Sequence, residues 1–134
     1  VVLSAEGRRI VTAANILIAV GTYPASPPSV PVDGDIILTS DDLVQLRRLP
    51  KKLVVVGGGI IGVEYASMFA ALQIEVIVVD KRERLLEFLD REAVDELMHQ
   101  MRKQRVTFRL GEAVERLEIT AGRGVFGVRE IDHC

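Results

Sequence analysis

One glycine-rich stretch limits what this chain can fold into more than any other feature. Residues 57–62 read GGGIIG and satisfy the spacing G-x-G-x-x-G. An apolar run rich in valine, residues 53–56, precedes the glycines, and a helix-like run, residues 63–72, follows them. A second apolar run, residues 76–79, then ends on Asp80. This order of strand, glycine turn, helix, strand and acid predicts a Rossmann-like βαβ unit.

A dinucleotide-binding site needs these residue types at these positions for physical reasons. Gly57 permits the tight turn out of the strand, Gly59 lacks the Cβ that would keep a pyrophosphate away from the backbone, and Gly62 lets the helix pack close to the sheet. The first N–H groups of the helix and its positive dipole end then face the phosphates. Asp80 stands where a carboxylate accepts hydrogen bonds from the adenosine ribose. The pattern favours dinucleotide binding over the simpler alternative that the glycines only form a tight turn.

The composition is that of one compact domain with a sizeable apolar core. The chain has 134 residues, of which 49% are hydrophobic, and a formal net charge of -2. This balance predicts no basic face for nucleic acid, and no apolar run approaches the roughly twenty residues that span a membrane. The single cysteine, Cys134, has no partner for an internal disulfide, which favours a cytoplasmic setting. Because the chain begins on Val1 and ends in a charged, strand-like tail, we expect it to be a piece of a larger protein.

Several elements are expected before the glycine turn. Residues 1–3 and 8–12 are strand-like on either side of a polar turn and predict a hairpin. The apolar run 15–21 is typical of a buried strand, and the four prolines of residues 23–31 predict a linker.

The next stretch is predicted to hold a short helix. Residues 36–38 are a short strand candidate, and Ser40 is the expected N-cap of a helix that runs to about Leu46. The basic residues 47–52 then form either a solvated loop or a phosphate-binding patch.

A second helix and a third strand are expected after Asp80. Residues 81–84 form a charged loop, and Asp90 is the expected N-cap of a helix over residues 91–104. Residues 106–110 predict the third parallel strand, which completes a βαβαβ unit. The apolar side chains of this helix follow helical spacing and are predicted core residues: Ala93, Val94, Leu97, Met98 and Met101.

The last part of the chain is predicted to be an antiparallel β-hairpin. Residues 113–119 and 125–131 are the strand candidates, and residues 120–124 join them. Because a free-standing hairpin is only marginally stable, we expect the sheet to continue beyond this chain or to be completed by the N-terminal strands. The predicted fold class is α/β, a Rossmann-like βαβαβ parallel sheet with an added antiparallel β-hairpin or meander.

With these motifs the chain resembles the flavin-containing pyridine nucleotide-disulfide oxidoreductases along nearly its whole length. Residues 57–72, GGGIIGVEYASMFAAL, look like the nicotinamide-nucleotide motif of that family. Residues 14–24 are similar to the end of its FAD domain, except that Val20 replaces the more usual threonine. The glycine motif alone is shared across the superfamily, but residues 57–72 as a whole and residues 82–90, RERLLEFLD, look most like the soluble pyridine nucleotide transhydrogenases.

The resemblance implies a nicotinamide-nucleotide domain at residues 32–134, preceded at residues 1–31 by the end of an FAD domain and a proline-containing linker. Glu64 would approach the nicotinamide ribose and the flavin side, and Val114 would lie against the adenine. The alternatives are a solvent-facing helix residue for Glu64 and ordinary core packing for Val114. The cofactor-binding residues expected are Gly57, Gly58, Gly59, Ile60, Ile61, Gly62, Glu64, Asp80, Lys81, Arg82 and Val114.

The resemblance also implies parts that this chain does not contain. They are the FAD motif, the redox-active cysteine pair that transhydrogenases lack as well, the C-terminal FAD segment, and the dimerisation domain with the catalytic histidine. The parent protein is then expected to be a homo-oligomer that carries FAD, and its other domains are the expected partners. His99 and His133 lie in no constellation with a nucleophile or an acid, so neither a catalytic residue nor a metal site is expected here.

The charges around Asp80 bear on which nucleotide binds. A carboxylate there accepts the 2′-hydroxyl of NAD and repels the 2′-phosphate of NADP, and Gly62 in place of alanine also favours NAD. Lys81, Arg82 and Arg84 are either partners for a 2′-phosphate or a solvated charged loop. We expect NAD(H) to bind more tightly than NADP(H), and no FAD to bind this chain.

Three functions follow from these observations. The first is the NAD(P)-binding domain of an FAD-dependent oxidoreductase in which hydride passes between NADH and NADP⁺ through FAD, or the same domain of a dihydrolipoamide dehydrogenase-like enzyme. In the second, the glycine motif holds FAD itself, which is less favoured because the motif follows a long segment containing prolines. The third is a non-catalytic module that senses nucleotide.

Overall fold

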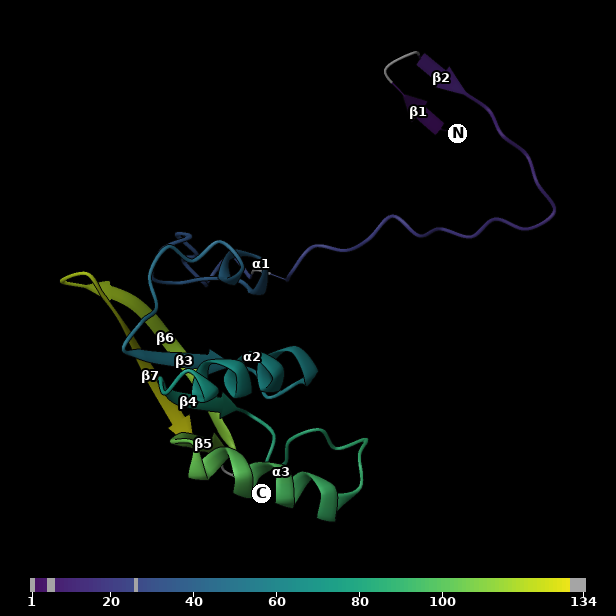
Figure 1. Cartoon of the computed structure of the whole chain (residues 1–134). Coiled ribbons are helices and arrows are strands. Elements are labelled where there is room, and N and C mark those ends of the chain that lie inside the picture. The colour runs from purple at the N-terminus through teal and green to yellow at the C-terminus, as the bar shows by residue number, and fades with distance from the viewer. Residues whose placement is uncertain (1, 5–6, 26, 131–134) are drawn as a thin grey trace.

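A parallel three-stranded sheet and two helices form the centre of the molecule. The computed structural model describes residues 2–4, 7–25 and 27–130. The central elements are β3 (Lys52–Val56), α2 (Ile60–Ala71), β4 (Glu75–Asp80), α3 (Arg91–Lys103) and β5 (Val106–Leu110). The strands lie in the order β3-β4-β5, both neighbouring pairs are parallel, and a helix links each strand to the next (Figure 1). The predicted βαβαβ unit is confirmed.

The middle strand, β4, is a run of valine and isoleucine because it is buried. β4 has a strand on each side and contacts α2. Val76, Val78 and Val79 are each at most 1% exposed. Alternation of apolar and polar residues is lost in such a strand because both of its faces are covered. Asp80, at the end of this buried strand, is therefore also buried and is only 5% exposed.

Helix α3 covers the sheet with one apolar face. Asp90 is its N-cap, as predicted. Ala93 is exposed, because it lies one position before Val94 and so points about 100° away around the helix. The other predicted core residues are buried or half-buried: Val94, Met98, Met101 and Leu97.

The C-terminal hairpin is a separate two-stranded sheet. β6 (Glu112–Thr120) and β7 (Arg123–Glu130) pair antiparallel, which confirms the predicted hairpin, although residue 131 lies outside the described residues. Ala121 and Gly122 join the strands with φ angles of 49° and 70°, which suit a two-residue hairpin turn. β6 contacts β4, and in Figure 1 the hairpin crosses behind the parallel sheet.

The N-terminal part of the chain stands apart from this centre. β1 (Val2–Ser4) and β2 (Gly7–Arg9) form the predicted hairpin, which is shorter than expected. They pair with each other and not with the β6–β7 sheet, so the expectation that they complete that sheet is wrong. After β2 the chain extends away from the hairpin toward the rest of the molecule (Figure 1).

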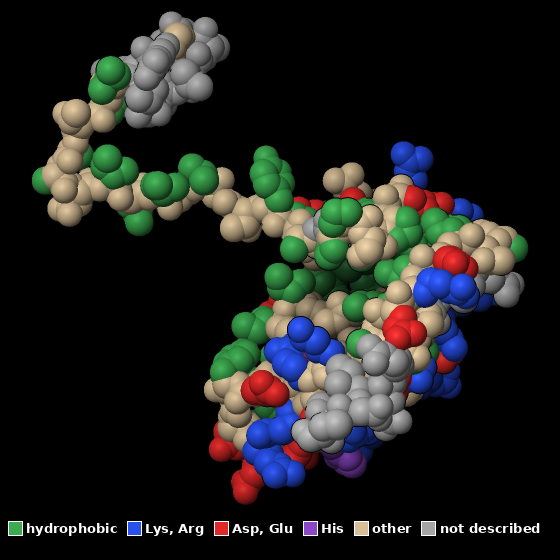
Figure 2. Space-filling view, turned by 180° about the vertical axis from the view of Figure 1, so that it is seen from behind, with side chains coloured by type: hydrophobic (Ala, Val, Ile, Leu, Met, Phe, Trp, Pro, Cys, Tyr) green, Lys and Arg blue, Asp and Glu red, His purple; other side chains and the backbone are tan. Residues whose placement is uncertain are grey.

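The buried strand predicted at residues 15–21 is also wrong. This run is extended but exposed, and the side chains of Leu17 and Val20 are 91% and 88% accessible to solvent. A buried strand needs a neighbour that pairs its backbone N–H and C=O groups, and the described residues place none beside this run. Figure 2 shows apolar side chains exposed along the extended segment that follows β2.

The short strand predicted at residues 36–38 is not formed. Oδ1 of Asp33 accepts the backbone N–H groups of Asp35, Ile36 and Ile37 at 2.8–3.1 Å. These donors are therefore satisfied within a tight loop and are not offered to a neighbouring strand.

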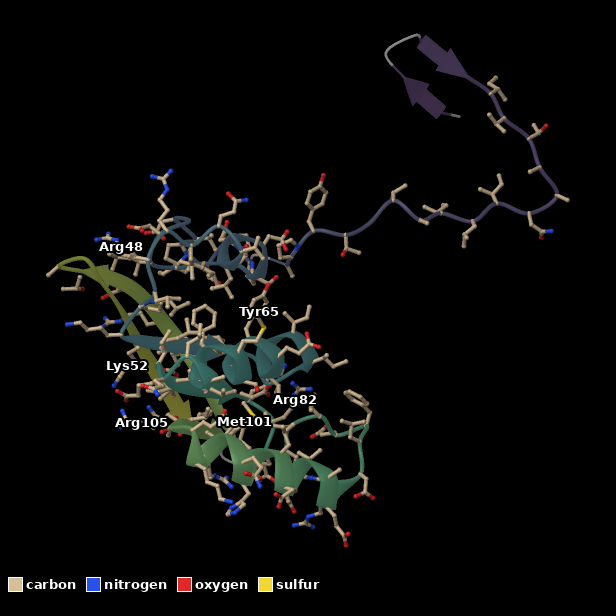
Figure 3. All side chains as sticks on the ribbon, in the orientation of Figure 1. Arg48, Lys52, Tyr65, Arg82, Met101 and Arg105 are labelled. Atoms are coloured by element: carbon tan, nitrogen blue, oxygen red, sulfur yellow. The ribbon has the colours of Figure 1, made fainter. Side chains whose placement is uncertain are left out.

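Helix α1 (Ser40–Leu43) is shorter than predicted and begins one residue earlier, with Thr39 and not Ser40 as its N-cap. The backbone N–H and the hydroxyl of Thr39 both donate to Oδ2 of Asp42 at 2.7 Å, which fixes this start. Tyr65 of α2 points toward α1 in Figure 3 and donates its hydroxyl to the carbonyl oxygen of Ser40 at 3.3 Å. In the described part of the chain, no helix has both the length and the apolar character that a membrane-spanning segment requires.

Candidate dinucleotide-binding site

The glycine turn joins the end of β3 to the start of α2. Gly57 has a φ of +108°, which L side chains rarely adopt, and its N–H donates to the carbonyl oxygen of Val79 at 2.8 Å. Gly59 is the N-cap of α2, and no side chain caps this end of the helix. Apart from its two chain neighbours, no described residue has an atom within 4 Å of the point where a Cβ of Gly59 would stand. The first N–H groups of α2 therefore face open space that an anionic group can enter.

Gly58 and Gly62 are glycines for another reason, which is lack of room. A Cβ on Gly58 would overlap Cδ2 of Leu85 and stand 3.2 Å from Oδ2 of Asp80. A Cβ on Gly62 would overlap the carbonyl oxygen of Gly57. The close approach of α2 to the turn thus depends on Gly62, and the contact between the turn and the loop after β4 depends on Gly58.

Asp80, at the end of β4, accepts four hydrogen bonds. Its Oδ2 accepts the backbone N–H of Gly58 at 2.5 Å and Nη2 of Arg82 at 2.6 Å. Its Oδ1 accepts the backbone N–H of Arg82 at 2.8 Å and Nε of the same residue at 3.0 Å. The carboxylate therefore fastens the glycine turn to the neighbouring strand, while the guanidinium of Arg82 bridges both of its oxygens.

These contacts keep Asp80 ionised although it is buried. Burial raises the pKa of Asp80, but the hydrogen bonds from the Arg82 side chain, those from the backbone N–H groups of Arg82 and Gly58, and the Arg82 charge outweigh it. Together they lower the pKa of Asp80 from 3.8 to about 2. Hydrogen bonding to Asp80 in turn raises the pKa of Arg82. At neutral pH the two residues form a closed ion pair.

A cavity of about 530 Å³ opens beside this pair, at the carboxyl ends of β3 and β4. Open α/β sheets bind their ligands at this edge, and the volume is within the range of small-molecule sites. Arg84, in contrast, is exposed and is not among the lining residues. The cavity is lined by Val56, Gly57, Val79, Asp80, Lys81, Arg82, Glu112, Ala113 and Val114.

Glu64, on the first turns of α2, lies in a different hollow. It is exposed and lines an apolar groove of about 670 Å³. The structure therefore does not gather all the predicted residues around one hollow. The cavity is lined by Gly57, Asp80, Lys81, Arg82 and Val114, and the groove by Ile60 and Glu64. The other four predicted residues line neither: Gly58, Gly59, Ile61 and Gly62. The groove is lined by Ile60, Val63, Glu64, Ser67, Met68, Leu86, Phe88, Leu89 and Leu97.

Leu85 and Glu112 belong to these surroundings but were not predicted from the sequence. Leu85 is fully buried against Gly58, and Glu112 lines the cavity and accepts Nε of Arg109 at 3.0 Å. The position of Glu112, two residues after the third strand, is a signal that could have found it, because all three strands end at the same edge. Leu85 carries no such signal, since its place depends on how the loop after β4 folds back.

His99 lines neither the cavity nor the groove. His99 is exposed on α3, and His133 lies outside the described residues. Among the residues that the structure describes, no three His, Cys, Asp or Glu side chains are gathered as metal ligands.

Comparison with known proteins gives a consistent match. Residues 1–130 match the family described as pyridine nucleotide-disulphide oxidoreductase. The chain is 49% identical over 109 residues to the soluble pyridine nucleotide transhydrogenase of Mycobacterium bovis, and 38% identical over 108 residues to that of Colwellia psychrerythraea. Each alignment covers 81% of this chain and 23% of the relative, so the chain spans about a quarter of the length of these relatives.

Solved structures that include a flavoprotein disulfide reductase share the fold of this chain. The HOCl-induced flavoprotein disulfide reductase RclA from Escherichia coli superposes with a TM-score of 0.71 at 32% identity, over 81% of this chain and 25% of that one. LpdA from Mycobacterium tuberculosis gives a TM-score of 0.74 at 27% identity, over 81% and 24%. By its sequence match over residues 1–130 and by its fold, the chain belongs to the pyridine nucleotide-disulphide oxidoreductase family.

Proposed function

We propose that this chain is the NAD(P)-binding domain of an FAD-dependent pyridine nucleotide oxidoreductase and supplies nucleotide binding only. Residues 32–134 would form the domain, and residues 1–31 would be the end of the FAD domain and the linker. One observation carries the proposal. The glycine turn is bonded through the N–H of Gly58 to the buried carboxylate of Asp80, beside an open cavity at the carboxyl edge of the sheet.

The residues at this edge suit the parts of a dinucleotide. The pyrophosphate would lie over Gly59, Ile60 and Ile61, where open space meets the positive end of α2. The adenosine would enter the cavity, with its ribose at Asp80 and its adenine against Val114. The nicotinamide half would extend to the other side of the turn, toward Glu64 and its groove.

The similarity to soluble transhydrogenases supports a parent protein of that type. FAD bound in the parent would accept hydride from NADH and pass it to NADP⁺. This chain would orient the nicotinamide nucleotide, while the FAD and dimerisation domains of the parent would supply the flavin site and the homo-oligomer. Its cytoplasmic location stays a prediction.

Charge favours NAD(H) over NADP(H) in this site. Asp80 is ionised and buried, so a 2′-phosphate brought to the ribose position would meet a negative charge in a poorly solvated place. Lys81 and Arg82 line the same cavity and reduce this repulsion. NADPH is therefore expected to bind, but more weakly than NADH.

Calorimetric titration of the chain with NADH, NADPH and FAD tests the proposal. NADH is expected to bind more tightly than NADPH, and FAD is expected not to bind. Gly59→Val should abolish NADH binding because its side chain enters the pyrophosphate position, and Asp80→Ala should shift the preference toward NADPH. Asp95→Ala is the matched control, because this carboxylate is exposed on α3. Failure of a folded chain to bind NADH, or tighter binding of FAD, would contradict the proposal.

A second candidate is the same domain in a disulfide reductase resembling dihydrolipoamide dehydrogenase. The likeness to the flavoprotein disulfide reductase RclA favours it. Both candidates use the nucleotide site in the same way, so the titration does not separate them. The sequence of the parent protein does, because a disulfide reductase needs a redox-active cysteine pair and the one cysteine here is Cys134.

A further inference from the structure

We propose that Arg82 is a specificity-determining residue that competes with the adenosine ribose for Asp80, so that nucleotide binds by displacing its guanidinium. This inference rests on the proposed function, because it concerns the same ribose position. It adds that the acceptor expected to receive the ribose hydroxyls is already occupied by the protein's own cation.

The occupancy of Asp80 carries the argument. An ionised carboxylate offers about four acceptor positions. All four are taken: the backbone N–H groups of Gly58 and Arg82 take two, and Nε and Nη2 of Arg82 take the other two. The backbone donors are fixed by the turn and by the end of β4. A ribose hydroxyl can therefore reach Asp80 only where the guanidinium leaves.

The exposure of the two side chains shows which partner can move. The side chain of Asp80 is 4% exposed and that of Arg82 is 39% exposed. Figure 3 places Arg82 at the end of the sheet where α2 begins, beside the loop that leads to α3. Both residues line the cavity, and the guanidinium, as the more exposed partner, can turn outward without crossing the apolar core. Arginine remains charged throughout this movement.

The two nucleotides would meet this arrangement differently. NADH offers ribose hydroxyls that replace the two guanidinium bonds, so its binding is opposed by the loss of a charge-assisted pair. NADPH brings a 2′-phosphate, for which a guanidinium is a favourable two-point partner and the bare carboxylate of Asp80 an unfavourable neighbour. Arg82 therefore weakens the binding of NADH and strengthens the binding of NADPH. This reduces the preference for NADH that Asp80 alone would impose.

Substitution of Arg82 by methionine tests this competition, because methionine keeps much of the side-chain length and removes the charge and the donors. The dissociation constants of NADH and NADPH are measured by calorimetry for the unsubstituted chain and for Arg82→Met, with circular dichroism to verify folding. We expect NADH to bind about three- to tenfold more tightly in Arg82→Met, and NADPH at least about tenfold more weakly, which is roughly the loss of one charge-assisted hydrogen-bonded pair.

Two further variants make the result specific. Arg84→Met removes an exposed cation of the same loop that does not line the cavity, and it should leave both constants within about twofold, which is roughly 0.4 kcal/mol. Arg82→Lys keeps the charge without the two-pronged geometry, and it should restore part of the NADPH affinity while NADH still binds more tightly than to the unsubstituted chain.

Changes of the same sign for both nucleotides in Arg82→Met would overturn the inference, because they would mean that Arg82 acts on the shared pyrophosphate or on the turn itself. Unchanged constants would overturn it as well. In both cases the proposed function would stand, since the unsubstituted chain binds NADH. If the folded, unsubstituted chain binds neither nucleotide, the proposed function fails and this inference with it.

Discussion

The backbone N–H of Gly58 donates to Oδ2 of Asp80 at 2.5 Å, and this bond joins two residues that lie 22 positions apart in the chain. One is in the turn after β3 and the other ends β4, so the bond locks the glycine turn to the neighbouring strand. Leu85 closes over the same point, because its Cδ2 occupies the space that a Cβ on Gly58 would need. The candidate site is therefore held by contacts that do not depend on a bound nucleotide.

The glycines of the turn should separate stability from binding. We expect Gly58→Ala to lower the free energy of unfolding by about 1–3 kcal/mol, because the added methyl overlaps Leu85 in a packed region. Gly59→Ala should change it by less than about 0.5 kcal/mol, because its Cβ stands in open space and its φ of -77° suits alanine. Urea denaturation followed by circular dichroism measures both.

NADH binding should be sensitive to the substitution at Gly59, although stability is not. Gly59→Ala is expected to weaken NADH binding at least about tenfold, or roughly 1.4 kcal/mol, because its methyl enters the proposed pyrophosphate position. Equal losses of stability in the two variants would contradict the different surroundings of the two glycines. Unaltered NADH affinity in Gly59→Ala would contradict the placement of the pyrophosphate.

Stability should fall at low pH through Asp80. Its pKa is about 2 in the folded protein and 3.8 ordinarily, so the unfolded chain takes up the proton first as the pH decreases. The stabilisation is complete above about pH 4 and is lost between about pH 4 and pH 2, with a total of the order of 2 kcal/mol. The free energy of unfolding, measured across this pH window, should change less steeply with pH in Asp80→Asn than in the unsubstituted chain. The exposed control Asp95→Asn should keep the original slope.

The N-cap of α3 should contribute more than an exposed ion pair on the same helix. Oδ1 of Asp90 accepts the N–H groups of Glu92 at 2.9 Å and Ala93 at 3.3 Å. Asp90→Ala is expected to cost about 0.5–2 kcal/mol of stability, because two backbone donors lose their partner. Asp95→Ala removes a 3.6 Å pair with Arg91 that is largely exposed, and it should cost at most about 0.5 kcal/mol. Thermal unfolding of both variants checks the order, which a larger loss in Asp95→Ala would reverse.

Two methionines offer a matched test of the core. Met101 is 2% exposed on α3 and points toward the sheet in Figure 3, whereas Met68 on α2 is 59% exposed. Met101→Ala should cost about 2–5 kcal/mol by leaving a cavity. Met68→Ala should change stability by less than about 0.5 kcal/mol in this chain. Similar denaturation midpoints for the two variants would contradict the assigned core.

The central unit could be predicted from sequence because its signals are local. The valine-rich runs, the spacing of glycines and the N-cap at Asp90 each depend on a few neighbouring residues. They located β3, β4, β5 and the two helices to within a few residues. The hairpin of β6 and β7 was predictable for the same reason, since Ala121 and Gly122 lie between two strand-like runs.

Two of the errors concern segments whose structure depends on a distant partner. Residues 15–21 have the composition of a buried strand, but composition does not supply the neighbouring strand that burial requires. Residues 36–38 are apolar as well, yet Asp33 binds the backbone donors that a sheet would use. In both cases a local preference for extended structure was present, and the absence of a partner in the described residues decided the outcome.

The order of the elements, the glycine turn and the acid at the end of β4 could all be predicted from local sequence, because turn and strand preferences act between residues close in the chain. The folded structure was needed to show that Gly58, Asp80, Arg82 and Leu85 form one cluster, and that Glu64 lies in a separate groove. The physical reason is that side-chain contacts across strands and loops depend on register and on how a loop folds back, and neither leaves a periodic mark in the sequence.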